Sequence, residues 1–327
     1  MFCVKKLSII VVLLAFLPPL SAADAADTKL LAEGRVDDAI ASLQGKISKL
    51  PNDAESYNLL CRAYFTLSDW DKGISACERA VSLEPGNAQY HLWLGRSYGE
   101  KADHSGFLSA AGLAKKVRGE FETAVRLDPN SAEARTDLAE FYLEAPGIVG
   151  GGRDKAEAQA QKLAVMDAVK AGWLKGRLAE KNKDLVSAEN AYRAAIDASH
   201  GAALAWLNLA FFYRHTKRMD AMEDAIRHAT SAPMNQPEVL MECAEMLLRS
   251  KRDVPQATQL LRRYLSSTVE VAPAFKAHYL LGTALEQQGD KSGAAQEYRA
   301  SLSLAKTFAQ AQSALDRLNS QVAHVVN

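Results

Sequence analysis

The chain of 327 residues carries 39 lysines and arginines against 39 aspartates and glutamates, so its formal net charge is zero. Binding to nucleic acid or to an anionic membrane through charge needs a basic excess, and this balance argues against both kinds of partner. With 48% hydrophobic residues and few prolines and glycines, the chain favours helices and is long enough to bury a large core.

The first residues have the pattern of a secretory signal peptide. Two lysines precede the apolar run 7–17, two prolines end it, and small residues follow at 21–26. The alternative is a transmembrane anchor, but the run is well short of the roughly 20 apolar residues that span a bilayer. We therefore expect residues 1–23 to be a signal peptide, cut within 22–26. The mature protein should be exported, periplasmic or secreted, and without a membrane span.

A helical pattern then repeats with a period of 34 residues, the separation of Pro51 and Pro85, each of which closes a helix-period run. Between these prolines, the side chains at helical spacing are Tyr57, Leu60, Tyr64, Ala76, Ala80 and Leu83. The same order of aromatic, leucine, small residue and tyrosine recurs from Ala203 and again from Phe275. Such self-similarity at a fixed period is typical of repeat architectures.

The pattern resembles the tetratricopeptide repeat, whose small residues let two antiparallel helices approach closely while aromatic side chains fill the space beside them. The resemblance implies an all-α fold, a right-handed superhelical solenoid of about eight helix–turn–helix units with a C-terminal capping helix. The solenoid would cover 24–321, with units at 20–53, 54–87, 88–131, 132–168, 169–202, 203–236, 237–274 and 275–308, a cap at 309–321 and a tail at 322–327.

Two units break the period by an insertion. Unit three holds ten residues too many, between Tyr98 and Val117, and unit four holds the glycine-rich stretch PGIVGGG at 146–152. We expect two long turns, 99–109 and 143–153, to lie side by side in adjacent units. Long loops of this kind either have no role in binding or form a contact surface for a partner.

The glycine-rich stretch 146–152 could also be a phosphate-binding loop, since Gly147 and Gly152 have the right spacing. Arg153 and Asp154, however, stand where such a loop needs lysine and serine or threonine, and no strand precedes them. We interpret the stretch as an elongated turn between helices. Gly147 would take the left-handed conformation there, and Asp154 would cap the next helix.

No pattern in the sequence indicates catalysis, a metal or a cofactor. The seven histidines are scattered without metal-binding spacing, and no G-x-S-x-G is present. Signal cleavage would leave Cys61, Cys77 and Cys243, too few for a disulfide scaffold. By the resemblance, Cys61 and Cys77 face each other across unit two. They could form a disulfide or stay reduced as small core residues.

The resemblance also implies a concave groove, lined by the first helix of each unit. Carried over residue by residue, the candidate peptide-binding residues are Asn58, Arg62, Phe65, Arg96, Trp173, Arg177, Phe211 and Arg214. Asn58, Arg62 and Arg96 partly resemble the family's carboxylate clamp, although its usual lysine and second asparagine are missing. They would bind an acidic or C-terminal segment of a partner. The alternative is that these arginines are solvated surface charges.

The sequence therefore predicts an exported scaffold or adaptor that binds a protein or peptide in its groove, without catalysis and without a cofactor. A co-chaperone or assembly factor for cell-envelope or secretion machinery is a special case that the sequence does not separate from it. An enzyme with an unrecognised site is the third class, for which the sequence offers no candidate residues.

Overall fold

The structure is a computed structural model and describes residues 22–234, 236–267 and 274–326. Nearly all of the expected signal peptide lies outside these residues, so its cleavage stays a prediction. The described part of the chain is all-α, with seventeen α-helices, one short 3-10 helix and no strand. None of its helices is long and apolar enough to cross a membrane.

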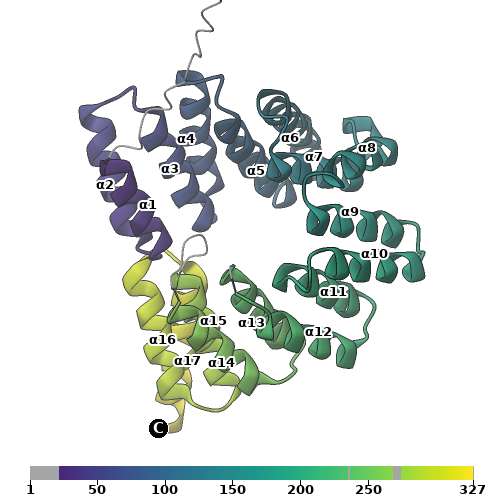
Figure 1. Cartoon of the computed structure of the whole chain (residues 1–327). Coiled ribbons are helices and arrows are strands. Elements are labelled where there is room, and N and C mark those ends of the chain that lie inside the picture. Colours follow the sequence, from purple (N-terminus) through teal and green to yellow (C-terminus); the bar gives the residue numbers. More distant parts are fainter. Residues whose placement is uncertain (1–21, 235, 268–273, 327) are drawn as a thin grey trace, which may run out of the picture.

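The helices form pairs joined by short turns (Figure 1). Their bounds are α1 Ala22–Ala32 and α2 Val36–Lys49, α3 Ala54–Thr66 and α4 Trp70–Leu83, α5 Ala88–Asp103 and α6 Phe107–Leu127, α7 Ala132–Glu144 and α8 Arg153–Leu163, α9 Ala168–Lys181 and α10 Leu185–Ala198, α11 Ala203–His215 and α12 Met219–Ser231, α13 Glu238–Arg249 and α14 Val254–Leu265, and α15 Ala274–Gln287 and α16 Lys291–Leu304. The last helix is α17 Ala309–Val326. Each pair matches one of the expected unit ranges to within one residue, and the predicted all-α solenoid is confirmed.

Aspartate begins many of these helices, because its carboxylate accepts a hydrogen bond from a backbone N–H of the first turn. The aspartates that cap the N–H three residues further on are Asp53, Asp69, Asp167, Asp184, Asp253 and Asp290. Helix α8 is an exception, since it begins directly after Gly152 with no side-chain cap. The predicted cap by Asp154 is therefore wrong, because that residue already lies inside the helix.

Within several pairs, a glycine of the first helix faces a large ring of the second helix at close range. A Cβ atom added to Gly176 of α9 would lie 2.4 Å from the ring of Tyr192 in α10. Two other pairs repeat this contact at 2.5 Å, Gly95 against Phe121 and Gly282 against Tyr298. Glycine is therefore needed at these positions for the backbones to approach as they do, as the repeat pattern predicts.

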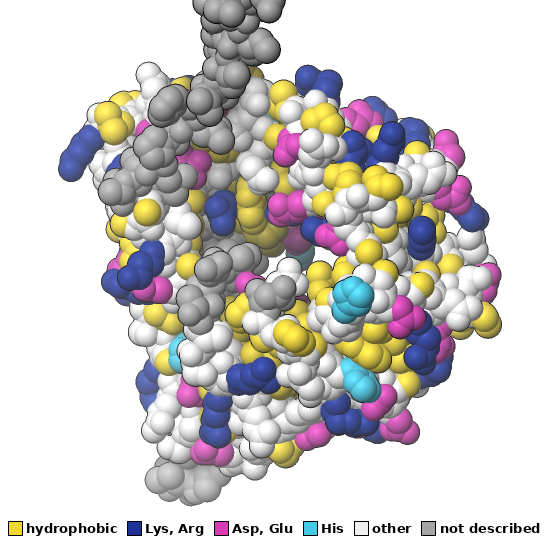
Figure 2. Space-filling model, in the orientation of Figure 1, with side chains coloured by type: hydrophobic (Ala, Val, Ile, Leu, Met, Phe, Trp, Pro, Cys, Tyr) yellow, Lys and Arg dark blue, Asp and Glu magenta, His cyan; other side chains and the backbone are white. Residues whose placement is uncertain are grey.

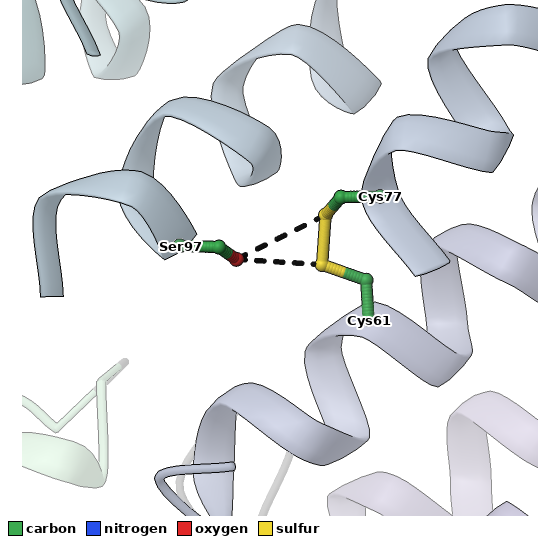
Figure 3. Close-up of a disulfide and its surroundings, with 3 residues drawn as sticks. All are labelled: Cys61, Cys77 and Ser97. Atoms are coloured by element: carbon green, nitrogen blue, oxygen red, sulfur yellow. Dashed lines mark hydrogen bonds between the residues drawn. A yellow bond between two sulfur atoms is a disulfide. The ribbon is translucent and has the colours of Figure 1, made fainter. Parts of the chain in front are cut away.

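A disulfide takes the place of this contact in unit two (Figure 3). Cys61 of α3 and Cys77 of α4 are bonded, with their Cα atoms 5.2 Å apart, and the Ser97 hydroxyl of α5 lies 3.5 Å from the Cys61 sulfur. Of the two alternatives that the sequence leaves open, the structure has the bridge. Closing a loop of 16 residues in this way contributes about 3 kcal/mol to stability.

The first and last helix pairs meet, so the solenoid closes into a ring (Figure 1). Phe308, just before α17, lies in one buried cluster with Val36 of α2 and Ala63 of α3. Asp37 accepts a hydrogen bond of 2.8 Å from the backbone N–H of Lys306. The C-terminal helix begins at this closure, and its Ala314, Leu315 and Leu318 lie in the buried cluster of the last helix pair, as expected of a capping helix.

Two expected boundaries are wrong. Helix α17 continues to Val326, through most of the expected tail 322–327, because no glycine or proline interrupts it. The expected long turn 99–109 is mostly helix: α5 runs to Asp103 and α6 begins at Phe107. The alanine- and leucine-rich insertion extends both helices of unit three, and α6 reaches 21 residues where the second helices of other units have at most 14.

Gly176→Ala should lower the free energy of unfolding by about 1–3 kcal/mol, because the new methyl group must displace the ring of the buried Tyr192. Gly45→Ala is the matched control: it lies on an exposed face of α2 with no atom within 4 Å of the new Cβ. It should raise stability by about 0.5–1 kcal/mol through helix propensity. Urea unfolding followed by circular dichroism measures both, and equal stabilisation by the two substitutions would contradict the close contact.

Candidate functional site

Units three and four enclose a cavity of about 810 Å³, between α5, α6, α7 and the turn after α7. The side chains that form its apolar part include Phe107, Ala110, Ala111, Ala114, Phe141 and Ile148. Its acidic part consists of Glu100, Asp103, Asp137, Glu140 and Glu144. In the space-filling view, hydrophobic and acidic side chains meet along the edge of the hollow at the centre of this face (Figure 2). The volume is in the range of ligand-binding pockets.

One wall of the cavity is the extension of α6. Its first two turns, residues 107–114, contribute Phe107 and three alanines to the lining. In the other helix pairs the second helix is shorter and has no such extension. The wall therefore exists because of the ten residues that unit three has beyond the repeat period.

The opposite wall is the turn between α7 and α8, which contains the 3-10 helix η1 Gly147–Val149. The predicted elongated turn is present, but Gly150 takes the left-handed conformation there, with φ of 101°, and Gly147 does not. A Cβ atom on Gly151 would lie 1.8 Å from the carbonyl oxygen of Ala145, so only glycine fits where the chain doubles back. The glycines are therefore required by the backbone conformation of this turn.

Two long basic side chains hold this turn in place. Arg118 of α6 donates a hydrogen bond to the carbonyl oxygen of Val149 at 3.3 Å, and Lys155 of α8 donates to that of Gly150 at 2.9 Å. Val149 is buried beneath the turn, whereas Ile148 is exposed. The turn is therefore an ordered wall that faces the extension of α6 across the cavity.

Three large apolar side chains lie exposed at the cavity: Phe107 and Ile148 line it, and Leu108 follows Phe107 in α6. Phe107 and Leu108 are each 86% exposed, and Ile148 is 90% exposed. Scattered surface hydrophobics are ordinary in proteins, but apolar side chains gathered beside a cavity mark interaction surfaces. We refer to Phe107, Leu108 and Ile148 as the apolar lip.

Three carboxylates of the cavity make no hydrogen bond or ion pair with any residue that the structure describes: Glu100 and Asp103 of α5 and Glu140 of α7. Burial raises the pKa of Glu100, and the neighbouring Asp103 raises it further. Loss of hydration within the cavity also raises the pKa of Glu140, and although Arg177 opposes this shift, nearby carboxylates add to it.

The predicted donor-rich patch at Arg62 and Arg96 does not consist of free guanidiniums. The Arg96 Nε donates to Asp137 at 2.6 Å and its Nη2 to Glu133 at 2.8 Å. Burial alone would lower the pKa of Arg96, but these two carboxylates outweigh it and raise that pKa. Both arginines also stack on Trp93, at 5.1 Å and 4.9 Å from the ring centroid. Arg96 is therefore not a free donor for the carboxylate of a partner.

Two of the predicted peptide-binding residues, Phe65 and Arg96, line the cavity. Phe65 packs edge-on against Trp93, with ring centroids 5.5 Å apart. Asn58 is only 3% exposed, and its side-chain NH₂ has no hydrogen-bond partner in the described part of the chain. Because Asn58 is buried, it does not form a clamp with the two arginines at the protein surface.

The remaining predicted residues lie outside the cavity, as two stacked pairs. The Arg177 guanidinium lies 5.9 Å from the Trp173 ring, and that of Arg214 lies 5.6 Å from the Phe211 ring. Arg177 also donates to Glu144 at 2.6 Å. In both pairs the cation lies over an aromatic face, an arrangement that stabilises an exposed arginine by about 0.5–1 kcal/mol.

Sequence reasoning missed the carboxylates Glu100 and Asp103 and two residues of the apolar lip, Phe107 and Leu108. The signal that could have found them is the insertion itself. It places a phenylalanine and a leucine directly after Ser105 and Gly106, beside the expected groove. No cluster of three or more histidine, cysteine or acidic side chains able to hold a metal ion occurs among the described residues.

Comparison with known proteins identifies the repeats. Residues 30–97 and 246–314 each match a tetratricopeptide repeat model, so the chain contains tetratricopeptide repeats near both ends of the solenoid. Proteins with these repeats generally mediate protein–protein interactions as non-catalytic scaffolds. No curated protein matches the sequence.

Several solved structures are similar to this chain. Yeast Tom70 is 15% identical with a TM-score of 0.54 over 88% of this chain, which spans 59% of the Tom70 chain. A tetratricopeptide repeat protein of Thermus thermophilus is 20% identical, with a TM-score of 0.48 over 58% of this chain and 96% of its own. One from Parabacteroides merdae is 14% identical, with a TM-score of 0.47 over 80% of this chain and 97% of its own. The similarity to Tom70 supports the solenoid fold.

Proposed function

We propose that this protein is an exported, non-catalytic adaptor that binds a segment of a partner protein in the cavity of units three and four. The observation that carries the proposal is the apolar lip, which the insertion in α6 and the turn after α7 hold exposed on two sides of one cavity. Covering an exposed side chain of this size contributes roughly 1.5–3 kcal/mol to binding.

The position of the lip favours a protein segment over a small molecule. A small ligand within the cavity would leave most of Phe107, Leu108 and Ile148 in water, since each is at least 86% exposed. A polypeptide can fill the cavity with one side chain and cover the lip with its neighbours. Short apolar anchors of this kind are how helices and extended peptides bind protein grooves.

Export is supported by two independent features. The N-terminal pattern is that of a signal peptide, and the Cys61–Cys77 disulfide suits an oxidising compartment such as a periplasm or the extracellular space. A co-chaperone or assembly factor for envelope or secretion machinery is a narrower form of the same proposal, and the identity of the partners decides it.

Site-specific photocrosslinking tests the binding site. Benzoylphenylalanine placed at Ile148 should give covalent adducts with a partner protein in the native compartment, because the partner covers this side chain. The matched control is Val165, which is 88% exposed and apolar but lies outside the cavity. Adducts should form from position 148 and not from 165, with the partner's crosslinked segment identified by mass spectrometry. Equal yields at the two positions, or none at 148, would refute the proposed site.

Intact-mass measurement of the exported protein tests its compartment. The mature chain should begin between Ala23 and Asp27, and alkylation of the denatured, non-reduced protein should modify one thiol, that of Cys243. After reduction, three thiols should be modified. A retained Met1 would contradict export, and three reactive thiols before reduction would contradict the disulfide.

A further inference from the structure

We propose that the partner segment bound in this cavity is cationic as well as apolar: its apolar side chains contact the lip, and adjacent lysine or arginine side chains contact Glu100, Asp103 and Glu140. The inference rests on the proposed function and adds the chemistry of the partner. It reverses the charge that the sequence predicts for the partner, an acidic or C-terminal segment.

The first argument concerns which charged side chains of the cavity already have partners in this chain. The cation of the lining, Arg96, is held by Asp137 and Glu133. Glu144 accepts from Arg177 at 2.6 Å and from Lys181 at 2.5 Å. The basic side chain of the cavity lining is therefore already paired with carboxylates of this chain. The charged side chains of the lining that have no partner are acidic.

The second argument is the placement of the unpaired groups. Glu100 and Asp103 are three residues apart, so they lie on the same face of α5, and Glu140 comes from the neighbouring α7. All three line the same cavity as the apolar wall of α6. They are also close enough across the helices that the charge of Asp103 contributes to the raised pKa of Glu140.

The third argument concerns the kind of cation. Glu100 is half-buried beside the apolar wall, and Asp103 and Glu140 are exposed, so a cation from a partner can reach and pair with these carboxylates. No cluster among the described residues is arranged to hold a metal ion, and a bare ion would leave the apolar walls exposed to water. Lysine and arginine carry a charge on an apolar stem, which matches an acidic cavity with an apolar wall.

An acidic segment fits this surface badly. Its carboxylates would approach Glu100, Asp103 and Glu140, and the guanidinium of the cavity lining, that of Arg96, already makes two short ion pairs. Like charges brought together oppose binding. Charge complementarity therefore selects a basic partner.

Peptide binding tests the inference with designed probes. Three short fluorescent peptides share one pattern of leucines and carry lysine, glutamine or glutamate at all other positions. Measured by fluorescence anisotropy with the mature chain, the lysine peptide should bind roughly tenfold or more tightly than the glutamine peptide, and the glutamate peptide should bind most weakly. Added salt should weaken the binding of the lysine peptide and leave that of the glutamine peptide nearly unchanged.

Two matched variants test whether the three carboxylates of the cavity cause the preference for the lysine peptide. Glu100→Gln with Asp103→Asn and Glu140→Gln should make the lysine and glutamine peptides bind alike. The control removes three exposed acidic charges outside the cavity, Asp154→Asn with Asp197→Asn and Asp316→Asn, and should keep the preference. A preference that both variants lose equally would be a long-range effect of net charge and would overturn the inference.

The outcomes separate this inference from the proposed function. If all three peptides bind equally and Phe107→Ser with Ile148→Ser weakens them all, the cavity is a binding site without charge selectivity, and only the inference falls. If no peptide binds, or the glutamate peptide binds best, the inference is also wrong, and photocrosslinking from position 148 still decides the proposed function.

Discussion

The close approach of the two helices in each pair is the constraint on which the rest of the structure depends. Glycine faces an aromatic ring in three pairs, and in unit two the Cys61–Cys77 disulfide holds the same position. Because these contacts fix how each pair packs, additional residues cannot be taken up inside a pair without breaking its seam. The insertion in unit three therefore continues α5 and α6 beyond their closest contact, as additional helical turns.

Those additional turns account for both the shape and the charge of the cavity. They place the start of α6 opposite the turn after α7, which Arg118 and Lys155 hold in place. The last turn of α5 also brings Glu100 and Asp103 to the same cavity as the carboxylates of α7. Arg96, which also lines the cavity, already makes ion pairs with carboxylates of this chain. One insertion thus produces an apolar wall and an acidic one, and a basic, apolar segment is complementary to both.

The structural features that recur with the repeat period were predicted from the sequence, and the contacts that occur only once were missed. Small residues such as Gly95 and Gly282 recur with the period, so the helix pairs and their seams followed from the pattern. The sequence did not decide whether Cys61 and Cys77 form a disulfide, because spacing does not tell whether two facing thiols are oxidised. Ion pairs such as Arg96–Asp137 join different units, and assigning positions within one unit does not show them. The ring closure depends on contacts such as Asp37 with Lys306, 269 residues apart, which leave no periodic signal.

The central claim is that the insertion in unit three serves binding and that the solenoid folds without it. Deleting residues 101–110, with Leu113→Asp to supply the helix cap that Asp69 supplies in unit two, restores the ordinary repeat length. The direct measurement is photocrosslinking from position 148 in this deletion variant, with urea unfolding as the check on its fold. The account predicts cooperative unfolding like that of the full-length mature chain and loss of the partner adduct. A folded deletion variant that still forms the adduct at full yield would contradict it.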